Sequence, residues 1–173
     1  LLKLRQAFQK TRFLQTFGTS ETGIARTTSR SSNSLEMKLG KENKDYKIVE
    51  GELWLKSNTQ VLGYLNADGS SFSDDGWFMT GDLVEDTGDG YLKISGRSKE
   101  IINVGGEKVL PVEVESVLFE MNEIDDVLVR STRNAITGQA VEADVVWNSS
   151  GEKKEVRRRI RRYCSTRLSS YKI

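Results

Sequence analysis

Four short segments of the sequence place hydroxyl, carboxylate and cationic side chains next to glycines. They are Phe17–Glu21, Gly51–Leu53, Gly76–Leu83 and Gly96–Glu115. A carboxylate in such a segment can hold a hard cation, and a guanidinium offers directional donors to anionic oxygens. An aromatic side chain adds a flat face on which a nucleic base can stack. Taken one at a time, these segments also fit ordinary turns, so spacing alone leaves both interpretations open.

The composition excludes several kinds of catalytic site. The 173 residues contain no His and one Cys, Cys164, so a zinc site, a His-based triad and an internal disulfide cannot be built. A cytoplasmic location is expected for such a chain. Cys164 lies near an apolar stripe with no base in its sequence surroundings, which favours packing over nucleophilic chemistry. No apolar run approaches ~20 residues and no signal peptide is visible, so no transmembrane segment is expected.

The elements that must position these segments are predicted from hydropathy periodicity and turn residues. A helix is predicted to end within residues 1–12, a strand to follow at Phe13–Phe17, and an exposed loop to occupy Thr27–Asn33. From Asp45 onward, alternating polarity is interrupted by turns rich in Asn, Asp and Gly. This pattern predicts a small antiparallel, barrel-like β unit over about 45–95.

The pattern changes after Gly96, and from about residue 98 it predicts the element order ββαββα. The pair Gly105–Gly106 fits a tight hairpin turn between the first two strands. Pro111 suits the first turn of the helix that follows, and a last helix with one apolar side is predicted over 152–168. The predicted fold class is therefore α+β, with a small antiparallel β subdomain followed by a compact α+β domain.

The four segments, taken in order, resemble the motifs of the adenylate-forming superfamily. That superfamily includes acyl-CoA synthetases, peptide-synthetase adenylation domains and luciferases. The resemblance covers most of residues 13–115 and is of the acyl-CoA synthetase type. It implies an enzyme that activates a carboxylic acid with ATP to an acyl-adenylate, releases pyrophosphate and then transfers the acyl group to a thiol. The implied substrates and cofactors are ATP/AMP, Mg²⁺, coenzyme A and an acid, with a fatty acid as the favoured class.

The resemblance assigns nucleotide-binding roles to the first matching positions. Phe17 matches the aromatic residue that stacks on adenine, and Gly18 follows it in the motif. Ser20 matches the hydroxyl that contacts the α-phosphate, which makes it a catalytic candidate, and Glu21 matches the carboxylate that helps to hold Mg²⁺. Asp82 matches the ribose-binding carboxylate, which accepts hydrogen bonds from the ribose hydroxyls.

The resemblance also implies a division into a large and a small domain. Arg97 matches an arginine that meets the ribose and the adenylate at the end of the large domain. Lys99 falls where relatives place the hinge about which the small domain rotates between two poses. This assignment makes residues 1–96 the end of the large domain, 97–100 the hinge and 101–173 the mobile C-terminal domain.

Three residues are expected to meet the thiol substrate. Gly105 and Gly106 match the loop that reaches the active site in the second pose, where missing side chains let the pantetheine arm approach the backbone. Lys108 lies where a cation could contact a phosphate of coenzyme A. The hairpin interpretation of the two glycines is compatible with this role.

Two parts of the superfamily pattern are not found in the sequence. These are the phosphate loop, which lies far upstream of the Phe17 motif in relatives, and the final Gly-Lys, a role that we do not assign to Lys172. We therefore expect the chain to be part of an AMP-forming acyl-CoA ligase and to be inactive alone. One alternative is an adenylation domain that loads a carrier-protein thiol. Another, from a different class, is a non-catalytic nucleotide-binding or interaction module.

The charge of the chain is unevenly distributed. Residues 152–173 carry nine Lys/Arg against two Glu, a net charge of +7, while the rest of the chain carries −6. The simplest interpretation is a solvated arginine face on the last helix. A more specific interpretation is that this helix contacts coenzyme A phosphates or an acidic carrier protein. No nucleic-acid partner is expected, because interleaved aromatics and recognised binding modules are absent from the sequence.

Overall fold

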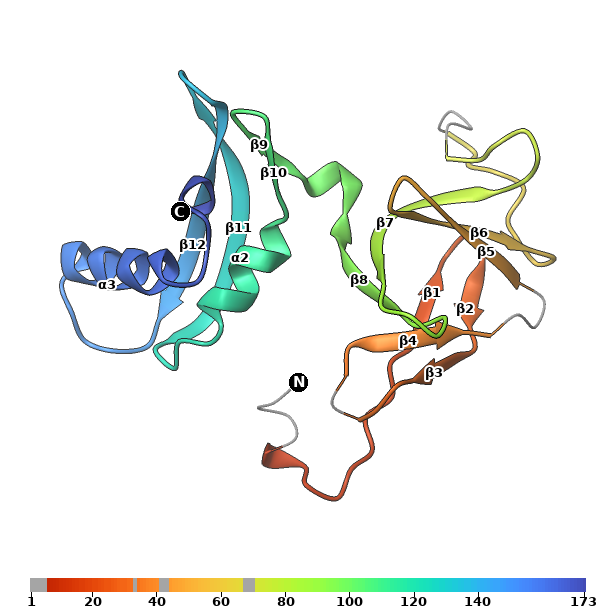
Figure 1. The fold of residues 1–173 in the computed structure, drawn as a ribbon, viewed down its shortest axis with the longest axis horizontal. Coiled ribbons are helices and arrows are strands. Elements are labelled where there is room, and N and C mark those ends of the chain that lie inside the picture. The colour runs from red at the N-terminus through yellow and green to blue at the C-terminus, as the bar shows by residue number, and fades with distance from the viewer. Residues whose placement is uncertain (1–5, 33, 41–43, 67–70) are drawn as a thin grey trace. The chain divides into compact units, whose positions relative to one another are not determined.

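The computed structural model describes residues 6–32, 34–40, 44–66 and 71–173 (Figure 1). The chain divides into two compact units, Leu1–Ser95 and Gly96–Ile173. Among the described residues, no helix is both long and apolar enough to cross a bilayer.

The first unit is built from antiparallel β-strands. A two-stranded sheet joins β1 to β2, and a six-stranded sheet has the order β3-β4-β8-β7-β6-β5. On β7 the buried and partly exposed residues alternate, as expected when one face of a strand covers a core. The strands are β1 (Phe17–Thr19), β2 (Gly23–Ala25), β3 (Thr27–Ser29), β4 (Glu36–Leu39), β5 (Lys44–Val49), β6 (Glu52–Ser57), β7 (Phe78–Asp86) and β8 (Leu92–Arg97).

The core of the first unit gathers apolar side chains from both sheets. Leu53 and Leu55, two residues apart on β6, are almost fully buried because alternate residues of a strand face the same side. The other members of this cluster are Phe17, Ala25, Met37, Leu39, Val84 and Leu92. The short β1–β2 pair is thus anchored to the larger sheet through Phe17 and Ala25.

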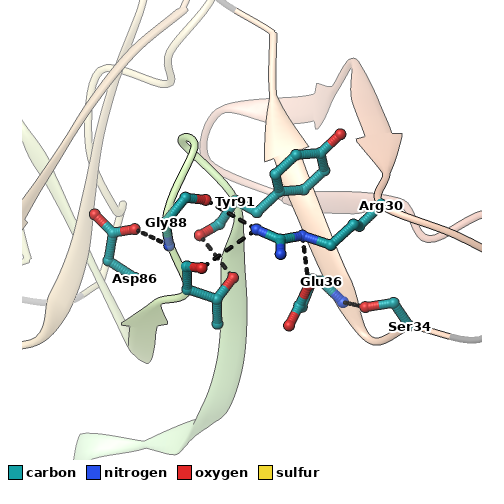
Figure 2. A network of polar contacts seen from close by, with 7 residues as sticks. Arg30, Ser34, Glu36, Asp86, Gly88 and Tyr91 are labelled. Carbon is teal, nitrogen blue, oxygen red and sulfur yellow. Dashed lines mark hydrogen bonds and ion pairs between the residues drawn. The ribbon is translucent and has the colours of Figure 1, made fainter.

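A polar network around Arg30 fixes the turn between β7 and β8 (Figure 2). The Arg30 guanidinium pairs with Glu36 at 2.7 Å and donates hydrogen bonds to the carbonyls of Thr87 and Gly88, at 3.2 and 3.0 Å. It also lies 4.6 Å from the ring centroid of Tyr91. One side chain that follows β3 therefore ties down a turn nearly sixty residues later in the sequence, by charge-assisted bonds and a cation–π contact.

The second unit combines a four-stranded antiparallel sheet, in the order β10-β9-β12-β11, with two α-helices. Its buried cluster joins the inner face of the sheet to α2 and to Cys164 of α3. Pro111 begins α2, where its missing N–H has no helical partner to lose. The elements are η1 (Ser98–Glu100), β9 (Ile102–Val104), β10 (Glu107–Val109), α2 (Pro111–Leu118), β11 (Ile124–Asn134), β12 (Gly138–Trp147), α3 (Lys153–Ser165) and η2 (Ser170–Lys172).

The predicted α+β class and the order ββαββα are confirmed, including the hairpin at Gly105–Gly106. The loop predicted at Thr27–Asn33 is wrong over its first residues, because Thr27–Ser29 forms β3 and pairs with β4. The sheet consequently starts upstream of residue 45. The strand predicted over Phe13–Phe17 is also wrong, since β1 begins only at Phe17. The predicted N-terminal helix falls partly on residues 1–5, outside the described residues, and is helical at residues 6–7.

Candidate functional site

The segment Phe17–Ala25 folds as a small hairpin that leaves no room for a side chain at Gly18. Gly18 pairs with Ile24 across the hairpin. A Cβ atom added at Gly18 would lie 2.8 Å from the Ile24 Cα and 3.2 Å from the Gly23 carbonyl oxygen. Backbone atoms cannot move aside as a side chain can, so this position requires glycine for a steric reason. The predicted motif glycine thus has a structural explanation within the hairpin.

Phe17 is buried in the core of the first unit. Its exposed fraction is 7%, and its ring packs in the cluster that includes Leu53 and Val84. In the described residues Phe17 therefore serves as a packing residue. Stacking on adenine stays a prediction that needs a face of the ring to be accessible.

Ser20 and Glu21 lie at the tip of the hairpin, which two threonines hold in shape. The hydroxyls of Thr19 and Thr22 are 2.9 Å apart, and the Thr22 backbone N–H donates to the Thr19 hydroxyl at 3.1 Å. Thr22 is fully buried, whereas Ser20 is exposed and Glu21 is partly exposed. The hairpin thereby presents a hydroxyl and a carboxylate side by side on a braced turn.

Glu21 is held by a segment far away in the sequence. The Tyr64 hydroxyl donates to Glu21 Oε1 at 2.6 Å, and the Val61 backbone N–H donates to the Glu21 carbonyl at 2.8 Å. The bond to the carboxylate raises the pKa of Tyr64, with further increases from burial and from the charge of Glu21 and an opposing effect of Ser71. Tyr64 was missed in the sequence, because no spacing rule connects residues 43 positions apart.

Asp82 lies in the middle of β7, so the turn interpretation of its segment is wrong. Its exposed fraction is 5%, and it shares the buried side of the strand with Thr80. The Thr80 hydroxyl donates to the Leu53 carbonyl at 2.6 Å and accepts the Asp82 backbone N–H at 3.0 Å. The neighbouring Gly81 N–H donates to Glu52 Oε1 at 2.8 Å. These bonds fix the backbone that leads into Asp82.

Arg97 and Lys99 lie where the first unit gives way to the second. Arg97 ends β8 in an extended conformation and precedes the short η1, which contains Lys99 and has no buried residue. Both side chains are exposed. A short 3₁₀ turn without buried side chains has little packing to resist a change in backbone angles, so this segment suits the hinge predicted at 97–100.

Gly105 and Gly106 form the turn between β9 and β10, both with positive φ, 61° and 98°. The Gly106 N–H donates to Asn103 Oδ1 at 2.8 Å, and the Gly105 N–H donates to the Thr137 carbonyl at 3.1 Å. The turn is thus tied to the tip of the β11–β12 hairpin. Lys108 is exposed on β10, close behind the turn in sequence.

The arginine-rich face of α3 is partly neutralised by acids that follow α2. Arg159 pairs with Glu123, and Arg167 lies 3.3 Å from Glu120 and stacks 3.7 Å from the Tyr163 ring centroid. These groups border an open groove of about 450 Å³. Its lining residues are Glu120, Met121, Asn122, Glu123, Arg159, Arg162, Tyr163, Thr166 and Arg167.

Cys164 is 4% exposed on the inner side of α3 and belongs to the core cluster. Burial raises the pKa of its thiol, and the nearby Arg167 partly opposes this effect. A raised thiol pKa disfavours the thiolate, so the environment agrees with the packing role expected from the sequence.

No cluster of three or more His, Cys, Asp or Glu residues that could hold a metal by itself occurs among the described residues. Mg²⁺, however, is commonly held by one or two carboxylates together with substrate phosphates and water. The single carboxylate of Glu21 on an accessible hairpin tip fits that mode of binding. A metal dependent on the nucleotide is therefore compatible with the residues present.

Comparison with known proteins relates the chain to CoA ligases, although no protein-family model matches it. It is 38% identical over 127 residues to the long-chain-fatty-acid–CoA ligase FadD13 of Mycobacterium tuberculosis, covering 72% of the chain and 24% of that protein. It is 36% identical over 126 residues to 2-methylpropanoate–CoA ligase CCL4 of Humulus lupulus, covering 71% and 23%. The chain spans about a quarter of the length of these relatives.

Solved structures show the same fold. The o-succinylbenzoate CoA synthetase MenE of Bacillus subtilis, in complex with its acyl-adenylate, superposes with a TM-score of 0.65 at 28% identity, over 76% of the chain and 29% of MenE. Coronafacic acid ligase of Pectobacterium brasiliense superposes with a TM-score of 0.70 at 26% identity, over 99% of the chain and 36% of that ligase. ATP-bound MatB of Rhodopseudomonas palustris superposes with a TM-score of 0.73 at 23% identity, over 91% of the chain and 34% of MatB. At this identity the match supports the fold alone.

Proposed function

The chain belongs to the adenylate-forming superfamily, in which its relatives are CoA ligases, and from this premise we propose that the whole protein joins a carboxylic acid to coenzyme A. In the first step a carboxylate oxygen attacks the α-phosphorus of ATP and pyrophosphate leaves. In the second, the thiolate of coenzyme A attacks the acyl carbonyl carbon, and AMP leaves with the electron pair of the broken C–O bond. A fatty acid is the favoured substrate class.

The observation that carries this proposal is the braced hairpin tip with Ser20 and Glu21. It offers a hydroxyl donor and a carboxylate side by side, as contact with a metal-bound phosphate requires. In the proposed first step the Ser20 hydroxyl donates to the α-phosphate, and Glu21 helps to hold Mg²⁺, which when bound offsets the charge of the phosphates. Asp82 accepts hydrogen bonds from the ribose, Arg97 donates to ribose and adenylate oxygens, and Phe17 with Gly18 borders the adenine.

The proposed second step uses the other unit. Residues 97–100, with Lys99, act as a hinge between the end of the large domain, 1–96, and a mobile domain, 101–173. The backbone at Gly105 and Gly106 then borders the pantetheine arm, because neither residue carries a side chain that would keep the thiol substrate away. Lys108 contacts a phosphate of coenzyme A. We place this reaction in the cytoplasm.

Pyrophosphate release tests the proposal. The whole protein is incubated with ATP, Mg²⁺ and a panel of fatty, aryl and short-chain acids, with and without coenzyme A. We expect acid-dependent pyrophosphate release with all components and thioester only when coenzyme A is present. The 173-residue chain alone should give no release. Absence of acid-dependent release from the whole protein with every acid would overturn the proposal and favour a non-catalytic binding module.

Transfer to a carrier protein is a second candidate, favoured by the exposed arginines of α3. Arg157 and Arg161 are exposed on this helix, and its segment carries the net charge of +7. An acidic carrier would be attracted to such a face. Thioester formation on an acidic carrier protein but not on coenzyme A would select this alternative.

A further inference from the structure

The segment that follows β6 donates hydrogen bonds to both the backbone and the side chain of Glu21. The Val61 N–H binds the Glu21 carbonyl, and the Tyr64 hydroxyl binds its carboxylate, at 2.8 and 2.6 Å. A single hydrogen bond between exposed groups is easily broken by water. Two bonds from residues three positions apart to one residue fix both its backbone and its side-chain direction.

The Tyr64 ring is itself held in place by a line of aromatic contacts that starts in the core. Its centroid lies 5.7 Å from that of Phe72, which lies 5.2 Å from that of Phe78. Phe78 is buried on β7, and Phe72 forms a β-bridge with it. Tilted aromatic pairs at these distances are attractive. The hydroxyl of Tyr64 is therefore aimed at Glu21 by a connected set of rings rather than by its own loop alone.

We propose that Tyr64 is a positioning residue, whose hydroxyl holds the Glu21 carboxylate in the orientation that receives Mg²⁺ with the nucleotide. The inference rests on the proposed function, which assigns the metal to Glu21. A carboxylate has about four acceptor positions, so a bond from Tyr64 restricts its rotation while leaving acceptor capacity for a metal. Carboxylates that bind metals are commonly oriented by such hydrogen bonds, and removing the partner typically weakens metal binding 10–100-fold.

The test compares Tyr64→Phe with Tyr91→Phe in the whole protein. Tyr64→Phe keeps the ring on Phe72 and removes only the hydroxyl. Tyr91→Phe removes a hydroxyl of the same unit and keeps the ring beneath Arg30, 4.6 Å from the guanidinium carbon. Pyrophosphate release is measured against free Mg²⁺, and Mn²⁺ binding in the presence of ATP is measured by electron paramagnetic resonance. Urea unfolding of each variant checks that the fold is retained.

We expect Tyr64→Phe to raise the Mg²⁺ concentration for half-maximal release by about tenfold, to weaken Mn²⁺ binding similarly and to keep most of kcat at saturating metal. Tyr91→Phe should match the wild type in all three. The inference would be overturned if Tyr64→Phe left the metal dependence unchanged, or lowered kcat or stability without changing metal affinity. The hydrogen bond between Tyr64 and Glu21 would then have a structural role only. A wild-type protein that releases no pyrophosphate with any acid would instead contradict the proposed function.

Discussion

Replacing Gly18 with alanine should destabilise the first unit through a collision between backbone atoms. The new Cβ would lie 2.8 Å from the Ile24 Cα, closer than such atoms approach in folded proteins, so either the backbone shifts locally under strain or the β1–β2 pair separates. Forcing an extra carbon into a packed site costs about 1–3 kcal/mol. If strands β1 and β2 separate instead, Phe17 loses burial that stabilises the fold by about 1.5–3 kcal/mol. Alanine also restricts the unfolded chain, which offsets about 0.4–1 kcal/mol.

The expected net loss is therefore about 1–2 kcal/mol in the free energy of unfolding. Urea unfolding followed by the fluorescence of Trp54 and Trp77 reports on the first unit when Trp147 is replaced by Phe in every variant. With an m-value of about 2 kcal/mol per molar, the midpoint should fall by about 0.5–1 M. The displaced hairpin tip should also lower pyrophosphate release by the whole protein more than stability alone explains, because it carries Ser20 and Glu21.

A double-mutant cycle with Ile24→Ala tests the reason for this loss. Ile24 is 80% exposed, so its truncation alone should change stability little. The Ile24 Cγ1 would lie 3.3 Å from the new Cβ, but the closer contact is with the Cα, which alanine retains. Gly18→Ala should thus cost the same in both backgrounds. An unchanged midpoint, or a cost that vanishes with Ile24→Ala, would refute the backbone explanation.

Three further outcomes follow from the second unit. Gly105→Asn should cost less than about 1 kcal/mol, because Asn tolerates a φ near 61° and the added Cβ would meet only the Thr137 side chain, at 3.5 Å or more. It should slow thioester formation but not pyrophosphate release, whereas Gly138→Asn should leave both unchanged, and equal effects of the two variants would count against the glycine-loop role. The hydrogen bond to Glu113 raises the pKa of Lys172, against an opposing effect of burial, so its stabilisation is complete below the ordinary value of 10.5 and is lost as pH rises through the folded pKa. The gap between the urea midpoints of the wild type and Lys172→Met should therefore hold below pH 10.5 and shrink as pH rises above it, and a gap that stays constant above pH 10.5 would contradict this. Burial raises the pKa of Cys164, so less of its thiol is ionised in the folded chain at pH 8. A disulfide reagent should therefore react with the folded chain about tenfold more slowly for each unit by which the pKa is raised, and should recover its full rate in urea. Equal rates in the folded and unfolded chains would contradict a buried thiol.

The second unit was largely predictable from the sequence because its signals are local. Pro111 marks the start of α2, and the pair Gly105–Gly106 marks a turn whatever surrounds it. The strand β3 was missed for the opposite reason. Its Thr-Thr-Ser sequence is polar and resembles a loop, and it becomes a strand by pairing with β4 along Thr27–Ser29.

In the candidate site, too, the features with a local sequence signal were predictable and those that depend on distant residues were not. Ser20, Glu21 and Asp82 belong to short motifs that can be found by eye. The partner of Glu21 cannot, because Tyr64 lies 43 residues away in a segment without periodicity, and only the folded chain brings the two together. The burial of Phe17 was likewise hidden, since a motif gives the identity of a side chain but not the neighbours that cover it.

The bond between the Gly105 N–H and the Thr137 carbonyl has a consequence for how the sequence can vary in length. The tip after β11 is a closed turn, because Asn134 Oδ1 accepts the N–H groups of Ile136 and Thr137 at 2.9 and 3.1 Å. An inserted residue there would shift Thr137 away from the glycine turn and break the bond from the Gly105 N–H. Although Ile136 is exposed, the tip should therefore tolerate substitutions far better than insertions or deletions. A peptide tag placed there would disturb a loop some thirty residues upstream, so labels for the second unit belong elsewhere.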